Sequence, residues 1–222
     1  MEPEETHTAP VEAGGNGEQE IKREVIEFVK MVVWFLALFV VLRTFVIEGY
    51  EVQGPSMEPT LCTRERILVL KLPHVLSQWS LFGDWDPIES GDIVVFRSPG
   101  DDSKRYVKRV VAKGPKKRGS KTVDAGENPG DAPGGNTVSV GIAEGKLYVN
   151  QRRVEEDYLP EGADPYMKDS GEATLGPGKY YMLGDNRGKS KDSRVFGPVS
   201  GERLIGRAVL RFWPPNKISL LQ

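Results

Sequence analysis

A serine held in a Gly-Pro turn is the first feature of this chain that could do chemistry. Ser56 lies in V-Q-G-P-S-M-E-P-T-L (residues 52–61), directly after Gly54 and Pro55. Glycine and proline favour a tight turn, which can expose a hydroxyl and leave nearby backbone N–H groups unpaired. Such N–H groups beside a nucleophile are what an oxyanion hole requires. The segment therefore suits a nucleophilic serine, although most serines in Gly-Pro turns serve the turn alone.

A lysine within an apolar strand is the second feature. In R-Y-V-K-R-V-V (residues 105–111) the strand period of two places Lys108 on the same face as Tyr106 and Val110. An apolar environment disfavours the charged ammonium and lowers the pKa of the lysine, so Lys108 would be a usable general base at mildly alkaline pH. The alternative is an edge-strand lysine that only discourages aggregation.

A charged loop is the third feature. G-D-N-R-G-K-S-K-D-S-R (residues 184–194) holds acidic, basic and hydroxyl side chains close together. Pairing of Asp192 with Arg194 or with Arg187 would make this loop rigid, and a serine hydroxyl could fix the orientation of a lysine. The same composition also suits a solvated surface loop.

Other reactive residue types offer no competing site in the sequence. No histidine follows the only cysteine, Cys62, at short range, and we interpret Cys62 as a small buried apolar residue. The two histidines, His7 and His74, lie in no recognisable motif, and clustered metal ligands are absent from the sequence. We therefore expect no metal and no cofactor. The net charge of −2 gives no basic excess for a nucleic-acid partner.

The elements that must position these residues have the pattern of short strands. The 25 glycines and 16 prolines favour many turns and a mostly β body. Residues 114–145 are hydrophilic and Gly-rich and predict a long hairpin or an insertion. Runs of β-branched and aromatic residues predict strands at residues 66–72, 92–96, 106–112, 146–150, 179–183 and 205–213.

The N-terminal part differs in composition. Residues 1–20 are acidic and contain few apolar residues, so we expect disorder there. A helical pattern follows over residues 21–47 and includes an uninterrupted apolar run from Met31 to Leu42. Residues 28–47 would cover roughly 30 Å of a bilayer at ~1.5 Å per residue. We predict a membrane anchor there, since no small-residue cleavage site follows the run, as a removable signal would require.

The charges beside the predicted anchor indicate its orientation in a cell membrane. Lys22, Arg23 and Lys30 lie at its N-terminal end, whereas Arg43 is the nearby cation at the other end. The positive-inside rule then places the N-terminus in the cytoplasm and the chain after Ile47 outside.

Ser56 would work close to such a membrane. Its distance from Ile47 in sequence is 56 − 47 = 9 residues, which reach at most about 30 Å when extended. The aromatic stretch L-S-Q-W-S-L-F-G-D-W (residues 76–85) could enter the lipid headgroups through Trp79 and Trp85, or it could pack within the protein.

Taken together, the three segments resemble, in the same order, the conserved boxes of type I signal peptidases. These are the Ser/Lys-dyad leader peptidases of bacteria, mitochondria and chloroplasts. G-D-I-V-V-F (residues 91–96) and I-G-R-A-V-L-R-F-W-P (residues 205–214) resemble two further boxes. The resemblance runs from the anchor to about residue 215. It implies a signal-peptidase-type β-sheet catalytic domain over residues 48–217, outside the membrane, on a single N-terminal transmembrane helix.

The resemblance also implies roles for the reactive residues. Ser56 matches the nucleophile of the family and Lys108 its general base. Ser190 matches a serine that hydrogen-bonds the lysine, and Asp192 and Arg194 match a structural pair behind the site. Lysine at the base position resembles the bacterial and organellar branch.

Oxyanion support and substrate binding are implied in the same way. Gly54 stands two residues before the nucleophile, where some members carry an oxyanion-binding serine, so this chain would use backbone N–H groups there. The expected activity is a membrane-bound serine endopeptidase that removes signal peptides from exported preproteins after Ala-x-Ala. In the family, certain positions line shallow pockets for the small P1 and P3 side chains of the substrate. The residues at those positions here are Val52, Met57, Leu61, Tyr106 and Val107.

The chain departs from the family pattern after Lys108. The usual Gly-x-Pro-Gly-Asp is replaced by A-K-G-P-K (residues 112–116). Two other classes of protein share parts of this pattern. A Ser/Lys self-cleaving repressor would need a DNA-binding helical domain and no anchor, and a catalytically dead membrane-tethered scaffold would be expected to have lost Ser56 or Lys108. Whether the substrate range is general or dedicated stays open.

Overall fold

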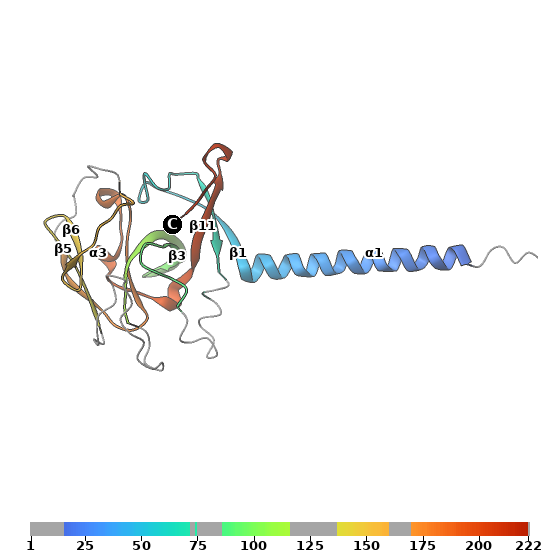
Figure 1. The fold of residues 1–222 in the computed structure, drawn as a ribbon, viewed down its shortest axis with the longest axis horizontal. Helices are drawn as coiled ribbons and strands as arrows, with labels where there is room; N and C mark the ends of the chain where they lie inside the picture. Colours follow the sequence, from blue (N-terminus) through green and yellow to red (C-terminus); the bar gives the residue numbers. More distant parts are fainter. Residues whose placement is uncertain (1–15, 72–73, 75–85, 116–136, 160–169, 222) are drawn as a thin grey trace, which may run out of the picture. The chain divides into compact units, whose positions relative to one another are not determined.

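The chain forms two units, Met1–Thr44 and Phe45–Gln222. Helix α1 (Asn16–Val41) belongs to the first unit, and two β-sheets belong to the second (Figure 1). The computed structural model describes residues 16–71, 74, 86–115, 137–159 and 170–221. Residues 1–15 of the predicted tail lie outside this range.

Helix α1 begins at Asn16, before the predicted start at Ile21. A short π-helical segment, η1 (Leu42–Val46), follows it. The large apolar side chains from Ile21 to Leu42 are exposed along the helix. Measured by length and mean hydropathy together, none of the helices in the described part of the chain qualifies as a membrane span. The anchor over residues 28–47 therefore stays a prediction.

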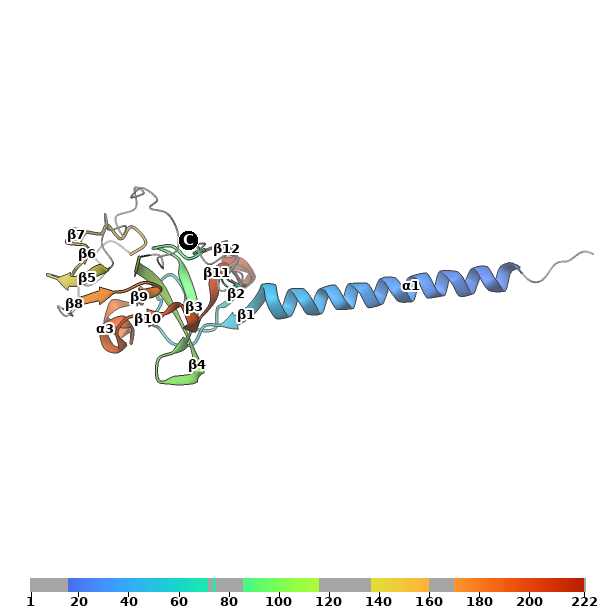
Figure 2. The same ribbon diagram turned by 90° about the horizontal axis from the view of Figure 1, so that it is seen from below.

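The larger sheet is antiparallel and contains eight strands in the order β1-β2-β11-β3-β4-β9-β10, with β12 beside β11 (Figure 2). The two strands at its centre, β3 and β4, share the longest register, from Ile93↔Arg109 to Arg97↔Arg105 and on to Ser98↔Asp101. The strands are β1 (Ile47–Glu51), β2 (Arg66–Leu70), β3 (Ile93–Ser98), β4 (Asp101–Lys113), β9 (Lys179–Leu183), β10 (Val199–Ser200), β11 (Leu204–Trp213) and β12 (Ser219–Leu220).

Strand β3 is buried on both faces and separates two cores. Ile93 and Val95 pack beneath the Ser56 segment, together with Met57 and Leu61. Val94 and Phe96 are part of the other core. A continuous apolar run, rather than an alternating one, is what a strand covered on both sides requires.

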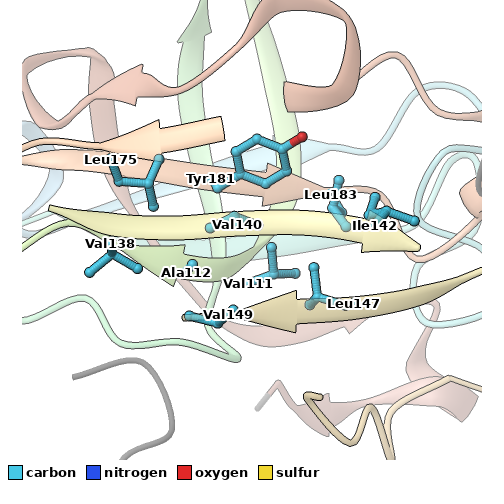
Figure 3. Packing of buried hydrophobic residues seen from close by; sticks show 10 residues of the cluster. All are labelled: Val111, Ala112, Val138, Val140, Ile142, Leu147, Val149, Leu175, Tyr181 and Leu183. Atoms are coloured by element: carbon cyan, nitrogen blue, oxygen red, sulfur yellow. The ribbon is translucent and has the colours of Figure 1, made fainter. Parts of the chain in front are cut away.

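A smaller sheet lies against the end of the larger one. Its strands are ordered β7-β6-β5-β8. Alternate residues of β5 are buried, and they pack with Val111 and Ala112 of β4 and with Tyr181 and Leu183 of β9 (Figure 3). The two sheets therefore share one core. The strands are β5 (Val138–Ala143), β6 (Lys146–Val149), β7 (Arg152–Arg153) and β8 (Ser170–Leu175).

All six predicted strands are present, which confirms the mostly β architecture. In the predicted hairpin or insertion, β5 occupies the C-terminal part, whereas residues 116–136 lie outside the described residues. Short helical turns complete the larger unit at η3 (Arg187–Lys189), α3 (Ser193–Phe196), η4 (Gly201–Arg203) and η5 (Pro215–Lys217).

Candidate active site

The fold brings Ser56 and Lys108 into direct contact, although they lie far apart in the sequence. The Nζ atom of Lys108 donates to the Oγ atom of Ser56 at 2.6 Å and to the carbonyl oxygen of Val107 at 2.8 Å. Two partners fix the direction of the amine. Ser56 and Lys108 therefore have the geometry of a nucleophile and its base.

A tight turn built on buried anchors presents Ser56. Gly54 has φ +87°, in the left-handed region that glycine adopts without strain. Met57 and Leu61, just after the serine, are completely buried in the core below. The backbone N–H of Leu61 donates to the carbonyl of Met57 at 2.8 Å, which closes the segment. The N–H of Ser56 donates to no group among the described residues and is available to a substrate oxygen.

Burial sets the protonation of Lys108. The residue is only 4% exposed, and the loss of solvation lowers its pKa from 10.5 to about 8. The carboxylates of Asp192 and Asp185 act in the opposite direction and favour the charged form. The ring of Tyr106 lies 5.7 Å from the Nζ atom, as expected for residues that share a strand face. Lys108 therefore loses its proton at mildly alkaline pH.

The loop over residues 184–194 packs against the backbone of Ser56. The N–H of Asn186 donates to the backbone carbonyl of Ser56 at 3.1 Å. Gly184 packs so closely that an added Cβ atom would lie 2.4 Å from that same carbonyl oxygen and 2.2 Å from the Oγ atom of Ser190. The backbone that carries the nucleophile is therefore in contact with this loop.

The predicted pair of Asp192 and Arg194 is present. The Nε and Nη2 atoms of Arg194 both donate to the Asp192 carboxylate at 2.8 Å, and the N–H of Gly184 donates to it at 3.0 Å. Burial opposes ionisation of Asp192, but these hydrogen bonds outweigh it and hold the pKa of the carboxyl below its ordinary value. Ser190 lies beside this pair, and its polar side chain also favours the ionised form of the Asp192 carboxyl. Its Oγ atom has no hydrogen-bond partner among the described residues, so the structure does not show the predicted bond between Ser190 and Lys108.

The structure contains two further buried ion pairs that the sequence patterns did not predict. Arg109 donates from Nε and Nη2 to Asp185 at 3.0 and 2.9 Å, and Arg187 binds Glu156. One signal was available, because the strand period of two puts Arg109 on the same face as Val107 and Val111, and a cation buried there requires a partner. Nothing in the sequence spacing identified that partner.

A cleft of about 560 Å³ lies beside Ser56 and Lys108. Val52, Tyr106 and Val107 line it, as predicted for substrate-binding residues, whereas Met57 and Leu61 are buried below and are not part of its lining. β9 pairs with β4 only from Arg109 onward. Up to that point the second edge of β4 has no partner strand within the described residues. An extended peptide could therefore align with the open edge.

The described residues contain no group of three His, Cys, Asp or Glu side chains placed to hold a metal ion. Cys62 is partly exposed rather than buried, because its turn lies at the surface, and its Sγ atom faces the carbonyl of Pro59 at 4.0 Å. His74 is buried. The aromatic stretch over residues 76–85 lies outside the described residues.

Known proteins match this chain over most of its length. The sequence profile described as "Signal peptidase, peptidase S26" matches residues 25–117 and 132–213. The probable signal peptidase I-2 of Synechocystis sp. is 33% identical over 202 residues, covering 88% of this chain and 77% of that protein. Signal peptidase I of Bacillus licheniformis is 30% identical over 206 residues, covering 89% and 93% of the two chains.

Among solved structures, the crystal structure of a signal peptidase I from Enterococcus faecalis is similar to this chain, with a TM-score of 0.37 and 27% identity, covering 55% of this chain and 97% of the other. The assignment to a family rests on the sequence matches, which span the serine turn, β4 and the charged loop.

Proposed function

Because this chain belongs to the signal peptidase family, peptidase S26, and is a hydrolase of the signal peptidase I type, we propose that it removes signal peptides with Ser56 as nucleophile and Lys108 as general base. The observation that carries this proposal is the 2.6 Å contact between the Ser56 hydroxyl and the buried amine of Lys108. No imidazole and no metal ion takes part in the proposed reaction.

Acylation begins with neutral Lys108. Its lone pair accepts the Ser56 proton while an N–H bond of the same amine is held by the Val107 carbonyl. The Oγ atom attacks the carbonyl carbon of the scissile bond, and the negative charge that develops on the substrate oxygen is stabilised by the free N–H of Ser56. Lys108 then gives the proton to the leaving amine, and the signal peptide remains as an ester of Ser56.

Deacylation repeats the same proton transfers with water. Lys108 accepts a proton from a water molecule, the hydroxide attacks the ester carbonyl, and the proton returns to the Ser56 oxygen as it leaves. The products are the signal peptide with a free carboxylate and the restored enzyme, so no cofactor is consumed.

The cleft suits small side chains beside the scissile bond. Val52 and Val107 give the cleft apolar walls, and the core beneath Ser56 is filled by Met57 and Leu61. We assign the P1 and P3 residues of an Ala-x-Ala substrate to this surface. The open edge of β4 would hold the extended substrate backbone.

Cleavage of a preprotein tests this proposal. The detergent-solubilised chain is expected to cut an Ala-x-Ala preprotein after the second alanine, as read by mass spectrometry of the new N-terminus. Replacement of the P1 alanine with tryptophan should lower kcat/KM by about 100-fold or more, because the proposed P1 subsite takes a small side chain, while the same change at P2 should matter far less.

The Ser56→Ala chain is the matched control, since it retains the cleft and lacks only the nucleophilic oxygen. A folded parent chain that leaves every Ala-x-Ala preprotein intact would favour the tethered scaffold instead. Equal cleavage by the Ser56→Ala chain would refute the catalytic assignment.

We further propose that residues 28–47 anchor the chain in a membrane, with the N-terminus in the cytoplasm and the catalytic unit outside. Exposed apolar side chains from Met31 to Val41 of α1, and Leu42 directly after it, support a lipid environment. Lys30 and Arg43 would extend toward the headgroups.

The full chain expressed in bacteria is expected to stay in the membrane fraction after an alkaline carbonate wash. Protease added outside spheroplasts should remove the catalytic unit. Release of the chain by carbonate would contradict the anchor, and protection of the catalytic unit would contradict the orientation.

A further inference from the structure

A buried ion pair joins Glu156, in the segment that follows β7, to Arg187 of η3 in the catalytic loop. The Nη1 atom of Arg187 donates to the Oε2 atom of Glu156 at 3.0 Å, and its Nη2 atom donates to Oε1. The side chains are only 3% and 10% exposed. The bidentate geometry and the burial make this a tightly held pair.

Tyr158 links this ion pair to the buried ion pair of Arg109 and Asp185. Its hydroxyl donates to Oε1 of Glu156 and lies 3.4 Å from Nη2 of Arg187. Its ring lies 4.0 Å from the guanidinium carbon of Arg109, which binds Asp185. Burial and the Glu156 carboxylate raise the pKa of Tyr158, so it stays a neutral donor.

Arg187 transmits this restraint to the nucleophile. Its Nε atom donates to the carbonyl of Gly184 at 3.1 Å, and its own carbonyl accepts from Arg194 at 2.7 Å. Gly184 and Asn186 are the two residues of the loop that press on or bond to the Ser56 backbone. Two residues, Arg187 and Gly184, therefore connect the Glu156 carboxylate to the Ser56 backbone.

We propose that Glu156 and Tyr158 are positioning residues for the catalytic centre, which hold the loop over residues 184–187 against Ser56 through the side chain of Arg187. This inference rests on the proposed function of Ser56 and Lys108. A buried arginine that loses its carboxylate is strongly destabilised and turns toward solvent. Arg187 would then release the Gly184 carbonyl, and the loop would no longer fix the position of Ser56.

Neither Glu156 nor Tyr158 lines the cleft. Their loss should therefore affect the reaction step more than substrate binding. It should also admit water to Lys108 and raise its pKa, because desolvation is the main cause of the depression. The two carboxylates that face Lys108 would stay in place, since Asp192 is held by Arg194 and Asp185 by Arg109.

The test is the Glu156→Gln substitution in the full-length, detergent-solubilised chain. We expect kcat to fall about 10- to 100-fold and KM to change less than about threefold. The midpoint of the pH profile should rise by about half a unit or more. NMR titration of ¹³Cε-labelled lysine should show the same rise for Lys108, whether or not a substrate is cleaved. The Glu156→Asp substitution, which keeps the charge, should recover part of kcat.

Two controls separate positioning from general stability. Glu155 is the adjacent carboxylate and is 71% exposed, so Glu155→Gln should change nothing. Glu156→Met combined with Arg187→Met removes both buried charges and should restore the melting temperature. It should leave kcat low, because Gly184 still lacks its donor.

A Glu156→Gln chain with the parental kcat and the parental Lys108 titration would overturn this inference. So would recovery of kcat together with the melting temperature in the double variant. Failure of the parent chain to cleave would instead count against the proposed function, and the Lys108 titration would still decide the role of Glu156.

Discussion

A Lys108→Met chain is expected to lose cleavage by about 10⁴-fold or more and yet to unfold at a higher temperature than the parent at pH 7. Methionine matches the length of the lysine and removes its charge. Burial lowers the pKa of Lys108 from 10.5 to about 8, and at about 1.4 kcal/mol per pH unit this depression corresponds to a cost of about 3 kcal/mol in folding free energy. The lost hydrogen bond to the Val107 carbonyl offsets part of the gain.

The stability difference depends on pH in a defined direction. Below about pH 8 both folded and unfolded chains carry the proton, and the folded state bears the full cost of a buried charge. Between about 8 and 10.5 the unfolded state binds more protons, so the parent chain becomes more stable as pH rises. The advantage of the methionine variant should therefore be complete at pH 7 and vanish near pH 10.5.

Cleavage by the parent chain should rise over the same titration, through about pH 8, because only neutral Lys108 accepts the serine proton. Thermal unfolding at several pH values and kcat/KM from pH 6 to 10, roughly the span that brackets this pKa, check both statements. Ser56→Ala is the matched control, since it should abolish cleavage without the gain in stability. Cleavage that peaks in acid, or a methionine variant no more stable than the parent at pH 7, would contradict the assignment of Lys108.

Local sequence patterns singled out Ser56 and Lys108 but left their roles open, and the roles of nucleophile and base came from the resemblance to a family. A Gly-Pro turn predicted the exposed serine, and the strand period placed Lys108 beside Tyr106 and Val110, where the structure has it. The strand runs were likewise local, since β-branched residues between turn residues indicate strands without knowledge of their neighbours. β3 illustrates this, because the run over residues 92–96 predicted the strand, whereas its burial on both faces became visible only in the structure.

The buried ion pairs depend on the register of strands, which the sequence does not specify. Arg109 meets Asp185 because β4 and β9 pair at Arg109↔Leu183, although 76 residues separate the two side chains. Glu156, in the segment after β7, binds Arg187 although 31 residues separate them in the sequence. No periodicity links such positions. For the same reason β5 was assigned to a hydrophilic insertion, since its buried face exists only against β4 and β9.

A Gly184→Ala chain is expected to fold and to lose about 100-fold or more in kcat. A Cβ atom at this position would lie 2.2 Å from the Ser190 Oγ atom and 2.4 Å from the Ser56 carbonyl oxygen. The Ser190 side chain could rotate away, but the carbonyl belongs to the backbone of the nucleophile and moves only if Ser56 moves. A displacement of about 1 Å at a reacting atom is enough to cost two orders of magnitude in rate.

The matched control is Gly141→Ala in β5, where an added Cβ atom meets no other atom within 4 Å. That variant should cleave as the parent does. Steady-state kinetics on one Ala-x-Ala preprotein, with circular dichroism melts of both variants, distinguish a displaced nucleophile from an unfolded chain. Parental kcat in a well-folded Gly184→Ala chain would mean that the loop can move away without Ser56, and the close packing of the loop on the serine backbone would then have no part in catalysis.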